Sequence, residues 1–275
     1  MNYKTCQLQH GPLSDRVYIM KIVPERVQDV LALAESLALE HHYSKIFAKI
    51  PIALIPEFMA QGYEEEARIP GLGEKPKGIA FMSNFITKKR KKPHKTSEIM
   101  KVKSATLTQG LSRKSTILSK DYSIKEAEIK DSPGLALLYR EIFASYPFPI
   151  TDPIFVAQSM AENVRYFVIR HKREIVAVAA AEMDYDCRAV EMTDFATIPA
   201  YRGNQLGQML LDHMETAMLT EPIDTAYTIA RAVSYGMNIT FGRADYEFAG
   251  TLINNTHIGG SIESMNVWYK QLIHI

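Results

Sequence analysis

The residues best suited to chemistry gather at one turn, residues 199–207. Its sequence, Pro-Ala-Tyr-Arg-Gly-Asn-Gln-Leu-Gly, follows a strand-like run, Ala189–Thr197, and opens a helical pattern. The first N–H groups of a helix have no acceptor within the helix, and the helix dipole makes that end positive, so such a turn can bind phosphate. Arg202 adds a fixed positive charge. The glycine spacing is not that of a dinucleotide-binding fingerprint, and the turn lacks the Gly-Lys-Ser or Gly-Lys-Thr ending of a P-loop.

Alternating strand and helix patterns after residue 120 must position this turn. Three strand-like runs separated by polar turns precede it, which indicates an antiparallel meander. Apolar residues at helical spacing follow it. The predicted order is β-α-α-β-β-β-α-β-α-β-β. The predicted elements are a strand at 124–130, a helix beginning at 131–133, a short helix ending near 161, strands at 164–170, 174–183 and 189–197, a helix from 206, a strand at 225–233, a helix at 234–244, and strands at 247–253 and 261–270.

The first 86 residues repeat the later part of this order. A strand, a helix, a strand, a short helix and two strands are predicted at 17–23, 24–40, 43–50, 52–61, 63–69 and 78–85. We interpret residues 1–86 as a partial, degenerate relative of the C-terminal domain at 121–275, with chance similarity of the two patterns as the alternative. No glycine-rich turn precedes the long N-terminal helix, so we expect no cofactor to bind there.

A basic segment separates the two parts. Residues 86–120 contain 11 Lys and Arg residues and one acidic residue, Glu98, although the whole chain has a net charge of only +1. The segment has no sustained apolar period and many Ser and Thr residues, so we predict that residues 87–120 form an exposed linker. A basic run can also bind the phosphates of a nucleic acid, which is the alternative.

Composition limits the class of protein. With 275 residues, 47% of them apolar and 23% charged, the chain is long enough for two domains or one large one and is unlike a disordered protein. Two cysteines, Cys6 and Cys187, provide neither a disulfide framework nor a four-ligand zinc site. We expect inert buried thiols, no metal, no signal peptide and no membrane-spanning segment, and therefore a cytoplasmic protein.

The turn resembles the pyrophosphate-binding turn of the GNAT acetyltransferase superfamily, Arg/Gln-x-x-Gly-x-Gly/Ala. Arg202 and Gly207 match the two ends of that pattern, and Gln205 takes the place of its middle glycine. Together with the order of elements after residue 120, this resemblance implies an α+β protein with the GNAT fold, a mixed and largely antiparallel sheet flanked by helices. A smaller, degenerate GNAT-like α/β domain precedes it. The resemblance also implies acetyl-CoA as the co-substrate.

A narrower resemblance extends over almost the whole chain. The runs 191–197, 226–232, 250–255 and 261–270, with Ile-Pro-Gly at 69–71 and Phe-Met-Ser at 81–83, are similar to bacterial and archaeal β-lysine N-acetyltransferases. This resemblance implies acetyl transfer from acetyl-CoA to the terminal amine of β-lysine. In that family the product is a compatible solute accumulated under salt stress, and a lysine aminomutase provides the β-lysine.

The GNAT resemblance also implies which residues hold acetyl-CoA. Backbone groups of the strand that ends at Thr197 are expected to pair with the pantetheine arm as an added strand does, and one N–H there to stabilise the oxyanion. Two residues at the helix start near residue 234 complete the set. The expected residues are Phe195, Ala196, Thr197, Arg202, Gly203, Asn204, Gln205, Leu206, Gly207, Ser234 and Asn238.

Acetyl transfer to an amine needs a base. An alkylammonium group has a pKa near 10.4 and must lose a proton, for example to a carboxylate, before it attacks a thioester. Glu191 is the first candidate, because in the GNAT resemblance it lies near the start of the fourth strand, where some members hold their base. Asp194 is the second candidate and, three residues further on, lies on the opposite face of a regular strand. The alternative is that both are solvated strand residues.

Recognition of β-lysine needs anions for two amines and a cation for one carboxylate. A Tyr-Pro-Phe-Pro loop beginning at Tyr146 is expected to wall the pocket, with a rigid surface turn as the alternative. Phe241 takes the place of a tyrosine that often acts as general acid in the superfamily, so no general acid is assigned. The expected substrate-binding residues are Tyr146, Asp152, Glu182, Arg231 and Glu263, with Arg231 on the carboxylate.

Two other functions stay open. One is acetyl transfer to another small amine, such as lysine, a polyamine or an amino sugar. The other is a non-catalytic module that responds to CoA and binds nucleic acid through its basic linker. The favoured hypothesis is an enzyme whose partner is a small-molecule amine, acting by direct attack without an acyl-enzyme. It includes no nucleic acid and no membrane, and a homodimer is one option for its assembly.

Overall fold

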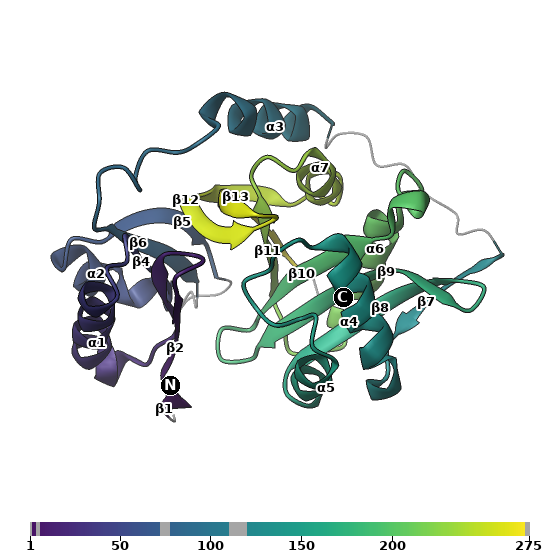
Figure 1. Ribbon diagram of the computed structural model, residues 1–275, viewed down its shortest axis with the longest axis horizontal. Coiled ribbons are helices and arrows are strands. Elements are labelled where there is room, and N and C mark those ends of the chain that lie inside the picture. The colour runs from purple at the N-terminus through teal and green to yellow at the C-terminus, as the bar shows by residue number, and fades with distance from the viewer. Residues whose placement is uncertain (1, 4–5, 72–77, 110–119, 273–275) are drawn as a thin grey trace.

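The computed structural model describes residues 2–3, 6–71, 78–109 and 120–272. In these residues thirteen strands form one sheet, with helices packed on its faces (Figure 1). The elements are β1 (Asn2–Tyr3), β2 (Cys6–Gly11), β3 (Arg16–Lys21), α1 (Val27–Glu40), β4 (Lys45–Pro51), α2 (Ile55–Ala60), β5 (Glu64–Ile69), β6 (Ile79–Phe85), α3 (Thr96–Gln109), β7 (Tyr122–Glu126), α4 (Ser132–Ile142), α5 (Pro153–Ala161), β8 (Val164–His171), β9 (Glu174–Asp184), β10 (Ala189–Thr197), α6 (Leu206–Met218), β11 (Thr225–Arg231), α7 (Tyr235–Arg243), β12 (Glu247–Ile258) and β13 (Ser261–Gln271). The order predicted after residue 120 is confirmed.

The sheet has two halves with the same strand order. Strands β2-β3-β4-β6-β5 of the N-terminal half correspond to β9-β10-β11-β13-β12 of the C-terminal half. Each half has one parallel pair, β3 with β4 across α1 and β10 with β11 across α6. The equivalent strands β5 and β12 pair antiparallel, so the halves meet edge to edge as an approximate two-fold pair. The repeat that the sequence pattern predicts is therefore present in the strand order.

Strand β9 has the longest run of fully buried residues among the strands of the C-terminal half. Residues 176–181 are all fully buried. Ala179 and Ala181 pack on the side of α6, whereas Val178 and Ala180 pack on the side of α4, because successive side chains of a strand point to opposite faces. Covering both faces explains why this run is continuously apolar. Its small alanines bring both helices close to the sheet that carries β10.

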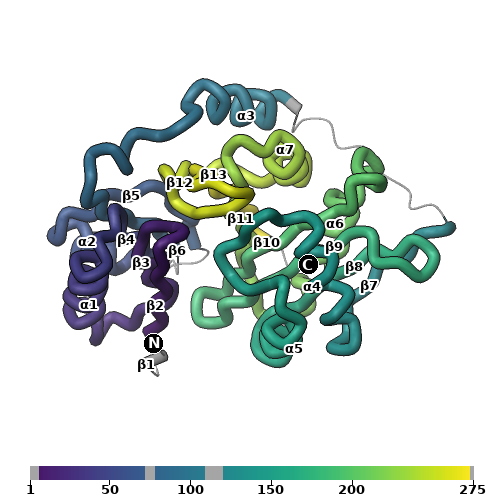
Figure 2. Tube along the Cα trace, in the orientation of Figure 1, coloured from purple at the N-terminus to yellow at the C-terminus, as the bar shows by residue number. Residues whose placement is uncertain are grey.

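A third core lies between the halves. Tyr18, Phe47 and Phe81 of the N-terminal strands pack with Tyr227 and Met265 of the C-terminal strands. The rings of Phe81 and Tyr227 have centroids 6.2 Å apart. Figure 2 shows the two halves on either side of the β12–β13 hairpin, which is drawn in yellow. The N-terminal half thus covers part of the same sheet that α4 and α5 cover elsewhere.

Close backbone approach and buried charges fix the seam between the halves. A Cβ added at Gly250 would lie only 2.1 Å from the carbonyl oxygen of Glu66, so this position in β12 requires glycine. Nearby, the fully buried Lys45 donates to the Glu66 carboxylate and to the carbonyl oxygen of Ile253, each at 2.8 Å. This pair lies within the N-terminal half, and its two hydrogen bonds with the main chain of Ile253 in β12, one from Lys45 to the carbonyl oxygen and one from the N–H to Glu66, join the halves.

The segment predicted to be an exposed linker is instead partly built into the fold. Helix α3 lies over α7 (Figure 1), and its Thr106 is buried against Gly242. Arg90 is buried and donates to the carbonyl oxygen of Asn254 at 2.8 Å and to the Asp15 carboxylate at 3.0 Å. The prediction was wrong because Ile99, Val102 and Thr106 form a short buried face on α3, and polar contacts to distant residues hold the stretch before it. The remainder of the predicted linker at 110–119 lies outside the described residues.

Candidate active site

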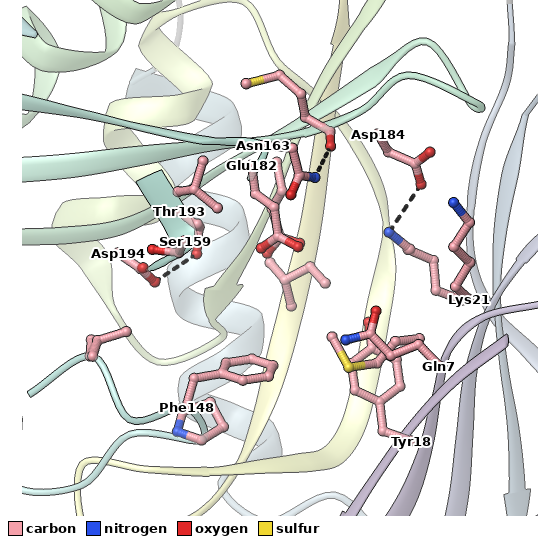
Figure 3. A pocket seen from close by; sticks show the side chains of 18 of the residues that line it. Gln7, Tyr18, Lys21, Phe148, Ser159, Asn163, Glu182, Asp184, Thr193 and Asp194 are labelled. Atoms are coloured by element: carbon pink, nitrogen blue, oxygen red, sulfur yellow. Dashed lines mark hydrogen bonds and ion pairs between the residues drawn. The ribbon is translucent and has the colours of Figure 1, made fainter. Parts of the chain in front are cut away.

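A cavity of about 690 Å³ lies between the two halves. Its walls come from β3 and β4 of the N-terminal half, from β9, β10 and β11 of the C-terminal half, and from the loop between α4 and α5. Tyr146 and Phe148 of that loop line the cavity, so the loop forms a wall as the sequence predicts (Figure 3). This volume is typical of a small-molecule site. The N-terminal half therefore contributes directly to the site.

Carboxylates converge on this cavity from two neighbouring strands. Glu182 of β9 and Glu191 of β10 are directly paired, so their side chains share one face of the sheet. Glu191 is also registered with Tyr227 of β11, whose hydroxyl interacts with its carboxyl group. Figure 3 shows Glu182 between Asp194 on one side of the cavity and Asp184 on the other.

A bulge in β10 brings Asp194 to the same cavity as Glu191, which corrects the prediction that they lie on opposite faces. The register with β9 shifts after Thr193, and Asp194 has a left-handed backbone with φ of 56°. Met192 packs on the α6 side before the bulge, and Phe195 packs on that side after it. One extra residue reverses the alternation of side chains. Thr193 and Asp194 consequently both line the cavity.

The two candidate bases differ in protonation. Asp194 accepts hydrogen bonds from the Tyr146 hydroxyl and from the Thr193 hydroxyl. Burial raises the pKa of Asp194 to about 6, a rise that these two hydrogen bonds limit. Burial and the facing carboxylate of Glu182 raise the pKa of Glu191 to about 8. At neutral pH Asp194 is therefore largely ionised, whereas Glu191 is largely protonated.

The start of α6 has the shape of a diphosphate site. Gln205 precedes the helix with a left-handed backbone, φ of 57°, and an exposed side chain. Glycine adopts this conformation freely, which fits the glycine that the GNAT pattern has there. A Cβ added at Gly203 or Gly207 would meet no heavy atom within 4 Å. Room therefore exists for a phosphate beside the N–H groups that a helix start leaves without internal acceptors.

Side chains of the turn hold its own backbone. The Arg202 Nε donates to the carbonyl oxygen of Thr197 at 3.2 Å, and the Asn204 amide donates to the carbonyl oxygen of Tyr201 at 3.0 Å. The Leu206 side chain is buried in the core beneath the helix. A ligand at the start of α6 would therefore contact the main chain of this turn and the exposed, positively charged Arg202.

Strand β10 has an open edge next to this corner. Its registered pairs with β11 end at Glu191, although its pairs with β9 continue to Thr197. Within the described residues, the backbone at 195–197 is thus paired on one side only. The Phe195 ring packs edge-on against Phe241, with centroids 5.5 Å apart, and Ala196 is buried. Their main chain, rather than their side chains, is available to a ligand lying as an added strand.

Three of the residues predicted to bind substrate lie elsewhere. Asp152 caps α5, because its carboxylate accepts a hydrogen bond from the Ile154 N–H at 2.9 Å. Glu263 is buried and pairs with Lys95 at 3.0 Å and with Arg231 at 3.4 Å. The structure does not bring Asp152, Arg231 and Glu263 to the cavity. Their charges serve contacts within the fold, which the sequence pattern alone does not show.

Asn238 is also unsuited to its predicted role in binding acetyl-CoA. The residue is fully buried, and its amide nitrogen donates to the carbonyl oxygens of Arg231 and Ser234. Its amide oxygen accepts from Asn266 at 2.8 Å and from the Trp268 indole at 2.9 Å. All its hydrogen-bonding capacity is therefore used inside the protein. Ser234 is half-buried at the start of α7.

Of the two cysteines that the sequence analysis expects to be buried, Cys6 is buried and Cys187 is only half-buried. Phe241 is fully buried between Phe195 and Tyr246 and has no proton to donate. Cys6 and Cys187 are free thiols, and burial together with the nearby Asp184 carboxylate raises the pKa of Cys187 to about 11. Cys187 is therefore a poor nucleophile at neutral pH.

Neither a metal-binding cluster nor a membrane-spanning helix occurs in the described residues. These residues contain no group of three or more His, Cys, Asp or Glu side chains arranged to hold a metal ion. None of their helices combines the length and apolar character needed to cross a membrane.

Comparison with known proteins gives a consistent family. The model of the acetyltransferase (GNAT) family matches residues 135–234. The chain is 37% identical to a β-lysine N(6)-acetyltransferase of Methanococcus maripaludis, over 96% of this chain and 95% of that protein. It is 28% identical to the N-acetyltransferase YodP of Bacillus subtilis, over 98% of this chain and 96% of that protein. It is 35% identical to a β-lysine N(6)-acetyltransferase of Methanosarcina mazei, over 56% of this chain and 57% of that protein.

Proposed function

The chain belongs to the β-lysine N(6)-acetyltransferases of the GNAT family, and from that membership we propose that it transfers the acetyl group of acetyl-CoA to N6, the terminal amine, of β-lysine. The observation that carries this proposal is the cavity between the halves, where Glu182, Glu191 and Asp194 lie beside the open edge of β10. Carboxylates at the mouth of an acetyl-CoA site suit a cationic amine as acceptor.

Glu191 accepts the proton of the attacking amine. An alkylammonium group with a pKa of ~10.4 is almost wholly protonated at neutral pH. Because the pKa of Glu191 is raised to about 8, its carboxylate is a stronger base than an ordinary glutamate. A bound ammonium group favours the ionised form of Glu191. Asp194, oriented by Tyr146, holds the ammonium group near the bulge.

Acetyl-CoA provides the thioester. The free amine attacks the thioester carbonyl carbon, so that a C–N bond forms and the C–S bond breaks to release the CoA thiolate. Glu191 holds the first proton, which the ammonium group gave up before the attack, and the second proton, which the nitrogen loses as the amide forms, neutralises the thiolate. A thiol of pKa ~8.5 leaves without a general acid, which agrees with phenylalanine at position 241. The turn at 202–207, the main chain at 195–197 and Ser234 form the surface expected to hold acetyl-CoA.

An amine panel tests this function. The full-length protein is incubated with acetyl-CoA and β-lysine, α-lysine, spermidine or glucosamine, free thiol is measured, and NMR locates the acetyl group. We expect kcat/KM for β-lysine to exceed that for the other amines by roughly 100-fold, with the acetyl group on N6. Inactivity on β-lysine together with turnover of spermidine would contradict the proposal. Binding of acetyl-CoA without thiol release on any amine would favour the non-catalytic module.

The cellular setting follows from the same family membership. N6-acetylation leaves β-lysine with one ammonium and one carboxylate group, and such a neutral zwitterion suits a compatible solute accumulated under salt stress. A lysine aminomutase as the source of β-lysine, a cytoplasmic location and the absence of a nucleic-acid partner belong to the proposal. So do the domain limits 1–86 and 121–275.

A further inference from the structure

The cavity wall opposite Asp194 is basic and comes from the N-terminal half. Six acidic and three basic side chains line the cavity, and all three basic ones belong to β3 and β4. In Figure 3, Lys21 lies across the cavity from Asp194, with Glu182 between them. The acidic residues are Glu162, Glu182, Asp184, Asp186, Glu191 and Asp194, and the basic ones are Arg16, Lys21 and Lys49.

Two of the three basic side chains have strong contacts within the protein. Arg16 is buried and donates to the carbonyl oxygen of Asn255 at 2.6 Å and to the Thr256 hydroxyl at 3.0 Å, which joins the halves. Lys21 is exposed and pairs with Asp186 at 2.6 Å. Neither arrangement leaves the cation directed toward a ligand deep in the cavity.

Lys49 differs from both. Its side chain is 18% exposed, and its Nζ lies 3.4 Å from the Asp184 carboxylate, longer than the ~2.7–2.9 Å of a well-formed charge-assisted bond. An ammonium group has three donors, so this single long contact leaves Lys49 able to bind a second anion. Although burial lowers the pKa of Lys49, the surrounding tyrosines and carboxylates raise it well above its usual value. Lys49 therefore keeps its charge at the pH of the reaction.

We propose that Lys49 binds the carboxylate of the substrate and thereby selects β-lysine over amines that lack a carboxylate. This inference rests on the proposed function. The carboxylate and N6 lie at opposite ends of the β-lysine chain, and in Figure 3 Asp184, the ion-pair partner of Lys49, lies on the other side of Glu182 from Asp194. Lys49 takes the role that the sequence analysis gave to Arg231. The degenerate N-terminal half then provides the residue that selects the substrate, whereas the C-terminal half provides the residues that carry out acetyl transfer.

A pair of substrates isolates the carboxylate. 1,4-Diaminopentane is β-lysine without its carboxylate and offers the same primary amine to acetyl-CoA. We expect Lys49→Met to lower kcat/KM for β-lysine by roughly 10- to 100-fold, mainly through KM, because one charged hydrogen bond is lost. Because Lys49 also lowers the pKa of Glu191, its loss affects the base equally for both substrates, so the decisive readout is the ratio of kcat/KM for β-lysine to that for 1,4-diaminopentane, which is expected to fall by roughly 10-fold or more. Lys49→Arg retains the preference for β-lysine in part.

The controls separate this role from a structural one. Lys91→Met removes one positive charge from an exposed lysine outside the cavity and is expected to change neither substrate. Lys49→Gln repeats the test with a polar side chain in case Lys49→Met does not fold. Equal losses on both diamines, or unchanged kcat/KM for β-lysine, would overturn the proposal for Lys49 while leaving acetylation of β-lysine intact. A wild-type enzyme inactive on β-lysine would instead refute the proposed function itself.

Discussion

Replacing Glu191 by glutamine is expected to lower kcat/KM for β-lysine by about 10²–10⁴-fold, the range that general base catalysis commonly contributes. The wild-type kcat/KM is expected to rise with pH and to bend near pH 8, where Glu191 becomes ionised. Without this base only the free amine reacts. The rate of Glu191→Gln should therefore keep rising through pH 9 without the bend, as the amine loses its own proton.

The matched control is Glu174→Gln, which removes a carboxylate from an exposed residue of β9 outside the cavity. Its pH profile and kcat/KM are expected to match wild type. A Glu191→Gln variant that retained the bend near pH 8 would show that another group accepts the proton. Asp194→Asn, compared in the same assay, would then identify whether the carboxylate at the bulge does so.

The same substitution is expected to stabilise the protein at alkaline pH. The pKa of Glu191 in the folded protein is about 8, above its usual 4.5, because burial and Glu182 oppose its ionisation. The protonated Glu191 therefore contributes to the free energy of unfolding in full below pH ~4.5, and this contribution is lost as pH rises through about 8. Glutamine does not ionise, so the Tm of Glu191→Gln should exceed that of wild type by more at pH 9 than at pH 5. If Glu191→Gln were instead less stable than wild type at pH 9, misfolding rather than the loss of a base would explain its lower activity.

Replacing Gly207 by aspartate is expected to weaken acetyl-CoA binding by roughly 100-fold or more. The new carboxylate would stand at the start of α6, where we propose that the diphosphate binds, and like charges repel strongly at short range. The fold should tolerate the change, since a Cβ at Gly207 meets no heavy atom within 4 Å and an acidic residue suits the first turn of a helix. Calorimetric titration with acetyl-CoA, together with the Tm, measures both effects.

Gly207→Asn is the control that separates charge from bulk. It has nearly the same size as aspartate without its charge, so we expect a loss several times smaller than that of Gly207→Asp. Equal and large losses in both variants would mean that the space beside Gly207 must stay empty for steric reasons. Wild-type affinity in Gly207→Asp would place the diphosphate away from this helix.

The order of elements could be predicted from the sequence because each element leaves a local pattern. The continuous apolar run in β9 and the periodic face of α6 depend on neighbours within the same half. The turn at 199–207 likewise shows its glycines and Arg202 directly. From these features the sequence predicts a diphosphate site at this turn and identifies the strand that carries Glu191, without any knowledge of tertiary packing.

The cavity itself depends on contacts that no local pattern encodes. Asp194 lines the same cavity as Glu191 only because one extra residue in β10 reverses the alternation of side chains between the two faces. No residue pattern in the run 191–197 predicts this bulge. Lys49 reaches the site only because β5 pairs with β12 and folds one half of the sheet over the other. Gly250 is required by that pairing, but the requirement becomes evident only in the structure, where the carbonyl oxygen of Glu66 lies beside it.

The buried polar network escaped prediction for a related reason. Arg90 and Asn254 are hydrophilic residues, which a sequence pattern assigns to the surface or to a turn. They contact each other through their main chains and side chains, although 164 positions separate them. Pairing of this kind satisfies buried polar groups without producing any apolar period.

The most direct test is a crystal structure of the full-length protein with a bisubstrate analogue, in which the CoA sulfur is joined through an acetyl bridge to N6 of β-lysine. We expect the diphosphate beside Gly203 and Gly207, the bridging amide next to Glu191 and Asp194, and the β-lysine carboxylate directed toward Lys49. An analogue whose β-lysine end lies outside the cavity between the two halves, away from these carboxylates, would contradict this expectation.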